Sequence, residues 1–275
     1  MELTINDLSK EYGRKKAVNH FSAKLTNGVY GLLGANGAGK TTLMRMICDV
    51  QTETKGAIFF NGKNIHDLGE KYRNILGYLP QNFGYYPNFT AYKFLMYISA
   101  IKGLPPKKAH NRTMELLQVV DLLTQKNEKI KTFSGGMKQR LGIAQALLND
   151  PCILILDEPT NHMDNETVSW LEEVLQKRKG ALLMVTHDRY FFDRVVNRTL
   201  EIDGGEGYLY TGNYSLFLQK REERRIAAAG AAQRLRNVYR RELAWISRGA
   251  EARRTKSKER IERFNELKKE VNNIK

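Results

Sequence analysis

The spacing of hydrophobic and polar residues predicts a chain in which strands and helices alternate. Period-two alternation and short apolar runs predict strands over residues 2–8, 17–25, 29–33, 75–79, 153–156 and 181–185. Apolar residues at helical spacing predict helices over residues 42–47, 91–123, 141–148, 167–176 and 215–275. Asn61-Gly62 is a strong turn signal and predicts a hairpin around residues 56–63. Strands that alternate with helices imply an α/β fold whose parallel sheet is covered on both faces.

Two regions depart from this alternation. Residues 91–123 are helical apart from Gly103-Leu104-Pro105-Pro106, which predicts an all-helical subdomain inserted at about residues 83–141. Beyond Tyr214 the chain is rich in Arg and Glu and contains no proline. Its apolar stripes predict two helices that form a hairpin turning near Gly249. We therefore expect one domain over residues 1–219 and a helical extension over residues 220–275.

Length and composition agree with a large domain that carries an appendage. The chain has 275 residues, of which 41% are hydrophobic. Cys48 and Cys152 lie in apolar stretches, which predicts core residues in a reducing compartment rather than a disulfide or a metal site. No apolar run approaches the roughly 18 residues of a membrane span, and the first residues lack the pattern of a signal peptide. We expect a cytoplasmic protein; a membrane role would place it peripherally at the inner face of the cell membrane, through a separate partner.

The formal net charge of +15 is distributed unevenly along the chain. Residues 220–275 hold 18 Lys and Arg against 8 Asp and Glu, whereas the preceding residues hold 27 against 22. The basic extension indicates a polyanionic partner such as RNA, and a solvated helix surface is the alternative.

A phosphate-binding loop stands between a short apolar run and a helical segment. Residues 34–41 match the pattern G-x-x-x-x-G-K-[ST], in which backbone N–H groups surround phosphate oxygens. Lys40 would reach the β- and γ-phosphates of a nucleotide, and the Thr41 hydroxyl would bind Mg²⁺. The phosphates would face a helix N-terminus, where the helix dipole favours anions. The residues expected to hold the nucleotide are Gly34, Asn36, Gly37, Gly39, Lys40, Thr41 and Thr42.

Polar residues follow three of the predicted strands. Asp157 and Glu158 come directly after a fully apolar strand, Gln81 follows the strand at 75–79, and His187 follows the strand at 181–185. Because the carboxyl ends of parallel strands converge on the ligand, we expect these side chains to meet at one edge of the sheet. Asp157 would hold Mg²⁺ beside Thr41, and Gln81 would bind Mg²⁺ or orient water. Glu158 would polarise the attacking water as a general base.

A second glycine turn, Ser134-Gly135-Gly136, opens the helix predicted at 141–148. It makes an anion-binding helix terminus, but it lacks the preceding strand and the lysine of a phosphate-binding loop. The turn therefore predicts an accessory phosphate contact. One chain cannot easily bring this turn onto its own phosphate-binding loop, which raises the question of a dimer.

The ordered set of motifs resembles the ATP-binding cassette (ABC) ATPases across residues 1–212. The motifs are Gly34–Thr42, Gln81, Ser134-Gly135-Gly136, Ile153–Glu158, Asn161-His162-Met163-Asp164 and Thr186-His187-Asp188. The resemblance implies a P-loop NTPase fold of ABC type, with a mixed sheet flanked by helices, that binds ATP and Mg²⁺ and hydrolyses ATP to ADP and phosphate. By this likeness, Ser134–Met137 completes the ATP site of a second cassette, Asp164 couples the two sites, and His187 contacts the γ-phosphate. Tyr12 matches the aromatic residue that stacks on adenine, although a strand-end aromatic would look the same.

The resemblance differs between the two halves of the chain. Residues 1–150, including Leu79-Pro80-Gln81 and the helical subdomain, look like the cassette of ABC-2 type exporters, which docks on a membrane permease. Residues 151–275, including Gly212-Asn213-Tyr214-Ser215 and the basic helices, are similar to ABC-F proteins, which bind the ribosome and usually carry two cassettes. We expect first an exporter ATPase that powers a separate membrane partner through ATP-driven dimerisation. The alternatives are a ribosome-associated translation or antibiotic-resistance factor of ABC-F type, and an ATPase fragment or chimera without a working partner.

Overall fold

The computed structural model describes residues 1–247 and 258–273, which divide into two compact units. The first unit is Met1–Phe217 and the second is Leu218–Lys275. The division falls within the long helix α9 (Tyr214–Ser247), so that the first residues of this helix pack with the first unit.

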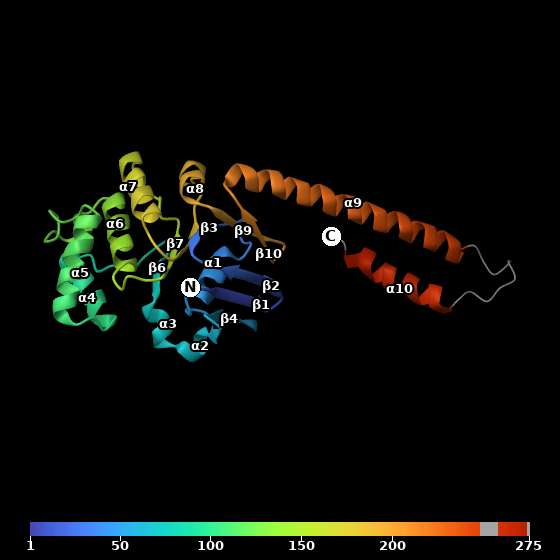
Figure 1. The fold of residues 1–275 in the computed structure, drawn as a ribbon, viewed down its shortest axis with the longest axis horizontal. Helices are drawn as coiled ribbons and strands as arrows, with labels where there is room; N and C mark the ends of the chain where they lie inside the picture. The colour runs from blue at the N-terminus through green and yellow to red at the C-terminus, as the bar shows by residue number, and fades with distance from the viewer. Residues whose placement is uncertain (248–257, 274–275) are drawn as a thin grey trace. The chain divides into compact units, whose positions relative to one another are not determined.

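The first unit contains two sheets (Figure 1). The antiparallel sheet has the strand order β2-β1-β4-β5, formed by β1 (Leu3–Tyr12), β2 (Lys15–Leu25), β4 (Lys55–Phe60) and β5 (Lys63–Asn64). The larger sheet has the order β10-β9-β3-β8-β7-β6, formed by β3 (Gly28–Gly34), β6 (Leu76–Leu79), β7 (Ile153–Asp157), β8 (Ala181–Val185), β9 (Arg198–Asp203) and β10 (Glu206–Thr211). All its pairs are parallel except β9 with β10. The mixed sheet confirms the expected fold class.

Helices cover the larger sheet and build the inserted subdomain. Those close to the sheet are α1 (Lys40–Ile47), α7 (Asn165–Gln176) and α8 (Arg189–Val195), with the short α2 (Ile65–Leu68) and α3 (Glu70–Asn74) before β6. The subdomain holds α4 (Ala91–Ile101), α5 (Pro106–Val119), a 3₁₀ turn (Ile130–Thr132) and α6 (Gly135–Ala146). Figure 1 shows α4, α5 and α6 grouped beside β6, away from β10.

The strand β7 lies at the centre of the fold because both of its faces are buried. Leu154 and Leu156 join the hydrophobic cluster that includes the helical subdomain, whereas Ile153 and Ile155 join the cluster around α1. Every residue of β7 is buried, as is every residue of its neighbour β8. This explains why both strands are uninterrupted apolar runs in the sequence.

Several boundaries differ from those that the sequence predicts. The helix expected at residues 141–148 begins at Gly135 and ends at Ala146, because the Ser134 hydroxyl caps it by accepting a hydrogen bond from the Met137 N–H at 3.2 Å. The interruption expected at Gly103–Pro106 is confirmed, because α4 ends at Ile101 and α5 begins at Pro106; α5 ends at Val119, before the expected end at 123. The hairpin around 56–63 is confirmed by β4 and β5. The helix α8 and the strands β9 and β10 were not expected from the spacing of apolar residues.

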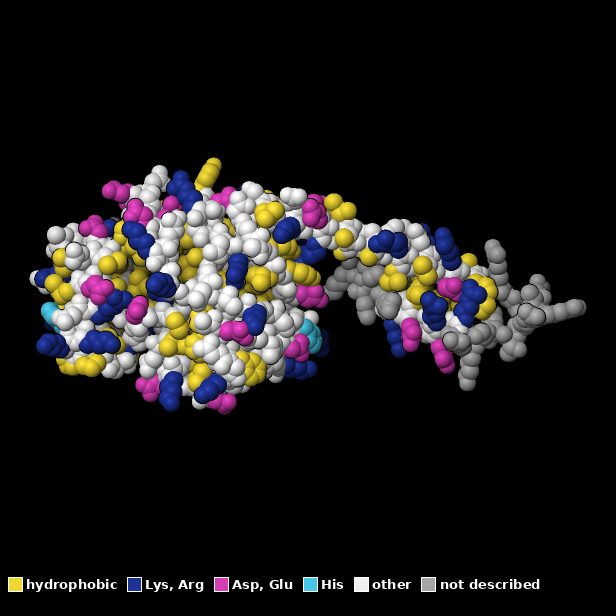
Figure 2. All heavy atoms as spheres, viewed as in Figure 1, with side chains coloured by type: hydrophobic (Ala, Val, Ile, Leu, Met, Phe, Trp, Pro, Cys, Tyr) yellow, Lys and Arg dark blue, Asp and Glu magenta, His cyan; other side chains and the backbone are white. Residues whose placement is uncertain are grey.

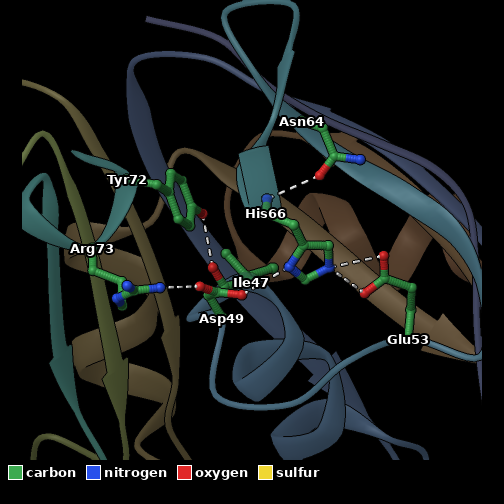
Figure 3. A network of polar contacts seen from close by, with 7 residues as sticks. All are labelled: Ile47, Asp49, Glu53, Asn64, His66, Tyr72 and Arg73. Carbon is green, nitrogen blue, oxygen red and sulfur yellow. Dashed lines mark hydrogen bonds and ion pairs between the residues drawn. The ribbon is translucent and has the colours of Figure 1, made fainter. Parts of the chain in front are cut away.

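A polar network holds the C-terminal end of α1 against the segments that follow it (Figure 3). The Asp49 carboxylate contacts His66 Nδ1 at 3.0 Å and accepts a hydrogen bond from Arg73 at 2.7 Å. His66 Nε2 lies 3.0 Å from a carboxylate oxygen of Glu53, and the Tyr72 hydroxyl donates to the carbonyl of Ile47 at 2.7 Å. The helix that starts at the phosphate-binding loop is therefore fixed at its far end.

The second unit consists of the rest of α9 and of α10 (Lys258–Asn273), which contact each other along the described residues. Arg260 forms two hydrogen bonds with the Glu242 carboxylate at 2.8 and 2.9 Å, and its guanidinium lies 3.9 Å from the ring centroid of Trp245. Tyr239 and Phe264 stack at 5.3 Å. These contacts agree with a helical hairpin; the turn expected near Gly249 lies outside the described residues. Within the described residues, no helix is long and apolar enough to cross a membrane.

Candidate nucleotide-binding site

A pocket of about 480 Å³ opens at the carboxyl edge of the parallel strands. The phosphate-binding loop follows β3, residues at the ends of β6, β7 and β8 form the facing side, and residues of β1 and β2 complete the pocket. Of the residues proposed from the sequence, those that line it are Tyr12, Asn36, Gly37, Gly39, Lys40, Thr41, Thr42, Gln81, Asp157, Glu158 and His187. The strand ends therefore converge as expected.

The phosphate-binding loop is shaped by Gly39, which has φ of +102° at the N-cap of α1. A Cβ at this position would lie 2.1 Å from the carbonyl oxygen of Ala17, so both the backbone conformation and the space require glycine. Lys40 folds back over the loop, where its ammonium donates to the carbonyls of Gly34 at 2.8 Å and Ala35 at 3.1 Å. The ammonium and the N-terminus of α1 thus face the same pocket, where they favour an anion.

Asp157 places a buried carboxylate at the end of β7, across the pocket from the loop. Asp157 is 4% exposed and, within the described part of the chain, its side chain has no hydrogen bond or ion pair. Burial raises its pKa, and the neighbouring Glu158 raises the pKa further, while Lys40 opposes both. A desolvated carboxylate without a partner fits a divalent cation, because the cation supplies the missing charge. The Thr41 hydroxyl and the Gln81 amide line the same pocket and offer further oxygen ligands.

Glu158 and His187 contact each other across the ends of β7 and β8. One carboxylate oxygen of Glu158 accepts a hydrogen bond from the backbone N–H of His187 at 3.2 Å. The other lies 3.3 Å from the ring atom His187 Nε2. The Glu158 side chain is 6% exposed, whereas that of His187 is 76% exposed. Glu158 lines the pocket and has φ of +54°, which is unusual for a residue with a side chain. A fixed carboxylate beside an exposed imidazole is suited to orienting water.

Tyr12 forms the outer wall of the pocket. Its ring is 48% exposed, its hydroxyl accepts a hydrogen bond from Gln51, and the Lys10 ammonium lies 5.6 Å from the ring centroid. The hydrogen bond from Gln51 is the main cause that lowers the pKa of Tyr12. An exposed ring at the rim is available to stack on a flat base.

Five of the proposed residues do not line the pocket. Gly34 contributes a carbonyl to Lys40 instead. Ser134 caps α6, and Gly135 and Gly136 form its first turn beside His162. The Asp164 carboxylate accepts a hydrogen bond from the Thr167 N–H at 2.8 Å at the start of α7, which lowers its pKa. The structure therefore does not bring the second glycine turn to the phosphate-binding loop of the same chain.

Some residues of the site carry no sequence signal. Lys15, Ala17 and Val185 complete the lining of the pocket. Gln139 on α6, which is 6% exposed, donates to the carbonyl of Glu158 at 3.2 Å and ties the helical subdomain to the end of β7. These residues act through tertiary contacts, so no short motif could have identified them. Val185 is the exception, because it is the last residue of the apolar strand predicted at 181–185.

Comparison with protein-family models identifies two matched segments. Residues 18–161 match a model described as ABC transporter, and residues 200–275 match a second model, an extension with the same description. The first match contains the phosphate-binding loop and the strand β7, and the second contains β10 and both helices of the second unit.

Curated relatives match almost the whole chain. It is 36% identical to an uncharacterised ABC transporter ATP-binding protein, YfmR, of Bacillus subtilis, over 98% of this chain and 47% of that protein. It is 32% identical to the energy-dependent translational throttle protein EttA of Mycobacterium tuberculosis, over 98% of this chain and 52% of that protein. The chain thus spans about half the length of the curated relatives it matches.

Solved structures match about three quarters of this chain in fold. The structure of an ATP-binding subunit of an ABC transporter superposes with a TM-score of 0.70 at 26% identity, covering 77% of this chain and 90% of that one. A dimeric post-hydrolysis state of the ATP-binding cassette MJ0796, bound to ADP and Pi, superposes with a TM-score of 0.66 at 23% identity. The match covers 76% of this chain and 98% of that one.

Proposed function

This chain belongs to the ABC transporter family of ATPases, and we propose that it binds ATP with Mg²⁺ and hydrolyses it to ADP and phosphate. The observation that carries the proposal is the convergence of Lys40, Asp157 and Glu158 on one pocket of about 480 Å³. A cationic loop, an unpartnered buried carboxylate and a second carboxylate held by an imidazole are the parts that phosphoryl transfer to water needs.

Each residue of the pocket has a separate role in the proposed binding and hydrolysis of ATP. Lys40 and the N-terminus of α1 neutralise phosphate charge, and bound Mg²⁺ would supply further neutralisation at Asp157, Thr41 and Gln81. Glu158 accepts the proton of the attacking water, and His187 holds the Glu158 carboxylate in place. Tyr12 binds the base at the rim.

We also propose that a second cassette completes the site. Ser134 and Gly135 are exposed and do not line the pocket of their own chain, so the anion-binding start of α6 is available to another molecule. In the proposed pair, each cassette offers Ser134-Gly135-Gly136 to the ATP of the other. The solved cassette MJ0796, which shares this fold, is dimeric. Dimerisation of Glu158→Gln with ATP, measured by analytical ultracentrifugation, tests this, and Ser134→Arg should prevent it.

For the partner, we favour the ribosome-associated, ABC-F type of function over the exporter type. The relatives that match 98% of the chain include EttA, and the matched extension covers the basic helices. Figure 2 shows Lys and Arg side chains on the visible face of the second unit. The exposed arginines of α9 are Arg225, Arg234, Arg236, Arg240 and Arg241. A basic helical surface of this kind suits RNA phosphates.

Ribosome co-sedimentation tests this partner. We expect binding at low salt that disappears at high salt, and a substantial loss when Arg234, Arg236, Arg240 and Arg241 are changed to Gln. The slope of log affinity against log salt should fall in magnitude by about 3, at roughly 0.7 for each phosphate of single-stranded RNA that these arginines neutralise. The matched control changes four exposed lysines of the first unit, Lys63, Lys71, Lys93 and Lys131, to Gln. Equal losses in both variants would contradict binding through α9.

The exporter type remains the second candidate because of the helical subdomain. Tyr86 and Tyr97 are 48% and 41% exposed, pack edge to face at 5.5 Å, and lie on the subdomain that also carries Ile101, which is 65% exposed. An exposed apolar group suits a protein contact. Co-purification of an integral membrane protein from detergent extracts, abolished in Tyr97→Asp, would favour this function over the ribosomal one.

A further inference from the structure

A second cavity of about 480 Å³ lies outside the nucleotide site. Its lining joins the segment from the end of α4 to the first turns of α5 with the segment between α6 and β7. The helical subdomain contributes Lys102, Lys108 and Arg112, and the other side contributes Asn74, Asn149 and Asp150. None of these residues lines the pocket that holds Lys40 and Asp157. We call this the basic cavity.

The basic cavity carries more positive charge than its acidic residues neutralise. Among the residues that the structure describes, Lys102 and Lys108 have no ion pair or side-chain hydrogen bond. The single acid of the lining, Asp150, lies 4.0 Å from Arg112 and has a side chain that is 90% exposed. Lys102 is half-buried and has no acidic partner, and this burial lowers its pKa. An anion in the cavity would relieve this cost.

Buried polar atoms in the same place also lack partners. Arg112 donates to Glu115 at 2.7 Å and to the carbonyl of Leu147 at 2.9 Å, but its Nε is buried without an acceptor. Asn149 contacts the carbonyl of Asn74 through Nδ2 at 3.5 Å, while its Oδ1 is buried without a donor. Both atoms are inaccessible to solvent, so the protein itself leaves polar groups on this wall of the cavity incompletely satisfied.

The N-terminus of α5 adds to the preference for an anion. Pro105, at the N-cap, lines the cavity and makes no side-chain cap, and the first turn of this 14-residue helix contains no acidic residue. Pro105 and Pro106 have no N–H, so the N–H groups of Lys107 and Lys108 are the donors at this end of the helix that lack a partner within it, and they carry the positive end of its dipole. The helix end, the two lysines and Arg112 therefore favour negative charge from the same side.

We propose that the basic cavity binds a small organic phosphate, such as a phosphorylated sugar or nucleoside. The phosphate would contact Lys102, Lys108 and the start of α5, and the organic part would lie against the opposite wall, which Asn74, Asn149 and Asp150 form. The volume suits a ligand of this size. Because the lining comes from both the helical subdomain and the segment before β7, the bound ligand would link these two parts of the first unit.

Isothermal titration calorimetry of the 275-residue chain tests the proposal in a Lys40→Ala background, which weakens phosphate binding at the nucleotide site. Ribose 5-phosphate should bind with a stoichiometry of one, and ribose should not bind. Lys102→Gln should weaken binding of ribose 5-phosphate at least tenfold, as should Lys108→Gln. The control Lys107→Gln removes the same charge from the same helix turn, but Lys107 does not line the cavity, and binding should change less than twofold.

Three results would overturn the proposal. The first is no saturable binding of ribose 5-phosphate, and the second is a loss of affinity in Lys107→Gln as large as that in Lys102→Gln and Lys108→Gln. The third is equal affinity for inorganic phosphate and ribose 5-phosphate, which would show that the organic part of the ligand contributes nothing to binding. Thermal unfolding of each variant without ligand checks the fold. Lys108 is exposed, so Lys108→Gln carries the test even if Lys102→Gln is destabilised.

Discussion

The carboxylate of Glu158 meets both the backbone N–H and the ring Nε2 of His187, at 3.2 and 3.3 Å. The two residues follow adjacent strands, β7 and β8, which are buried throughout and therefore hold their ends in fixed register. Gln139 secures the carbonyl of Glu158 from the helical subdomain at 3.2 Å. The proposed general base is thus positioned by the sheet, by the imidazole and by the subdomain together.

Replacement of Glu158 should separate chemistry from binding. We expect Glu158→Gln to lower ATP turnover at least about 100-fold, the usual size of a general-base contribution, while ATP binding is retained. Steady-state phosphate release and equilibrium binding of ATP measure the two effects. Glu173→Gln, at an exposed position of α7, is the control and should keep turnover. Turnover near that of the unchanged protein in Glu158→Gln would remove this residue from the role.

Replacement of Lys40 should weaken the binding of nucleotide itself. The ammonium donates to two loop carbonyls at 2.8 and 3.1 Å and lines the pocket, so we expect it to turn toward phosphate oxygens. Charge-assisted hydrogen bonds contribute about 1.5–3 kcal/mol, which corresponds to a tenfold to hundredfold weaker affinity for ATP in Lys40→Ala. Lys63→Ala, at an exposed position of β5, should leave the affinity unchanged. Equal affinities in the Lys40→Ala variant and the original chain would contradict the loop as the phosphate site.

The phosphate-binding loop also predicts a contrast between two glycines. A Cβ at Gly39 would lie 2.1 Å from the carbonyl oxygen of Ala17, whereas a Cβ at Gly37 would have no atom within 4 Å. Both have positive φ, of +102° and +80°, so the difference between Gly39→Ala and Gly37→Ala isolates the steric clash. We expect Gly39→Ala to be less stable than Gly37→Ala by about 1–3 kcal/mol, the usual cost of overpacking, with weaker ATP binding. Equal thermal unfolding midpoints would show that the loop relaxes without cost.

Features encoded in contiguous residues were predictable, and features made by distant segments were not. The phosphate-binding loop and the carboxylates after β7 are local patterns with a fixed place on a strand end, and the structure brings them to one pocket. Lys15 and Gln139 join the site only through folding, because they come from β2 and α6. The start of α6 was predicted at residue 141, whereas the helix begins at Gly135. Gly135 and Gly136 indicated a turn, and the Ser134 cap that starts the helix was not recognised.

The network around His66 should make the stability of the first unit depend on pH. Hydrogen bonding to Glu53 raises the pKa of His66, with a further contribution from Asp49, whose other carboxylate oxygen accepts from Arg73. A raised pKa in the folded state means that the stabilisation is complete below the unfolded pKa of about 6.5 and is lost as pH rises through the folded value. The His66 side chain is 35% exposed, so the contribution should be at most about 1 kcal/mol.

Thermal unfolding of the original chain and of His66→Gln measures this contribution. The difference in stability between the two should be larger at about pH 6 than at about pH 8.5, because lower pH favours the protonated imidazole that the carboxylates stabilise. Glu53→Gln should likewise destabilise the chain more at about pH 6 than at about pH 8.5. The control is His110→Gln, because the His110 ring contacts the Tyr92 hydroxyl instead; this variant should keep the pH dependence of the original chain. A gap that is constant with pH would show that His66 stabilises the first unit by packing alone.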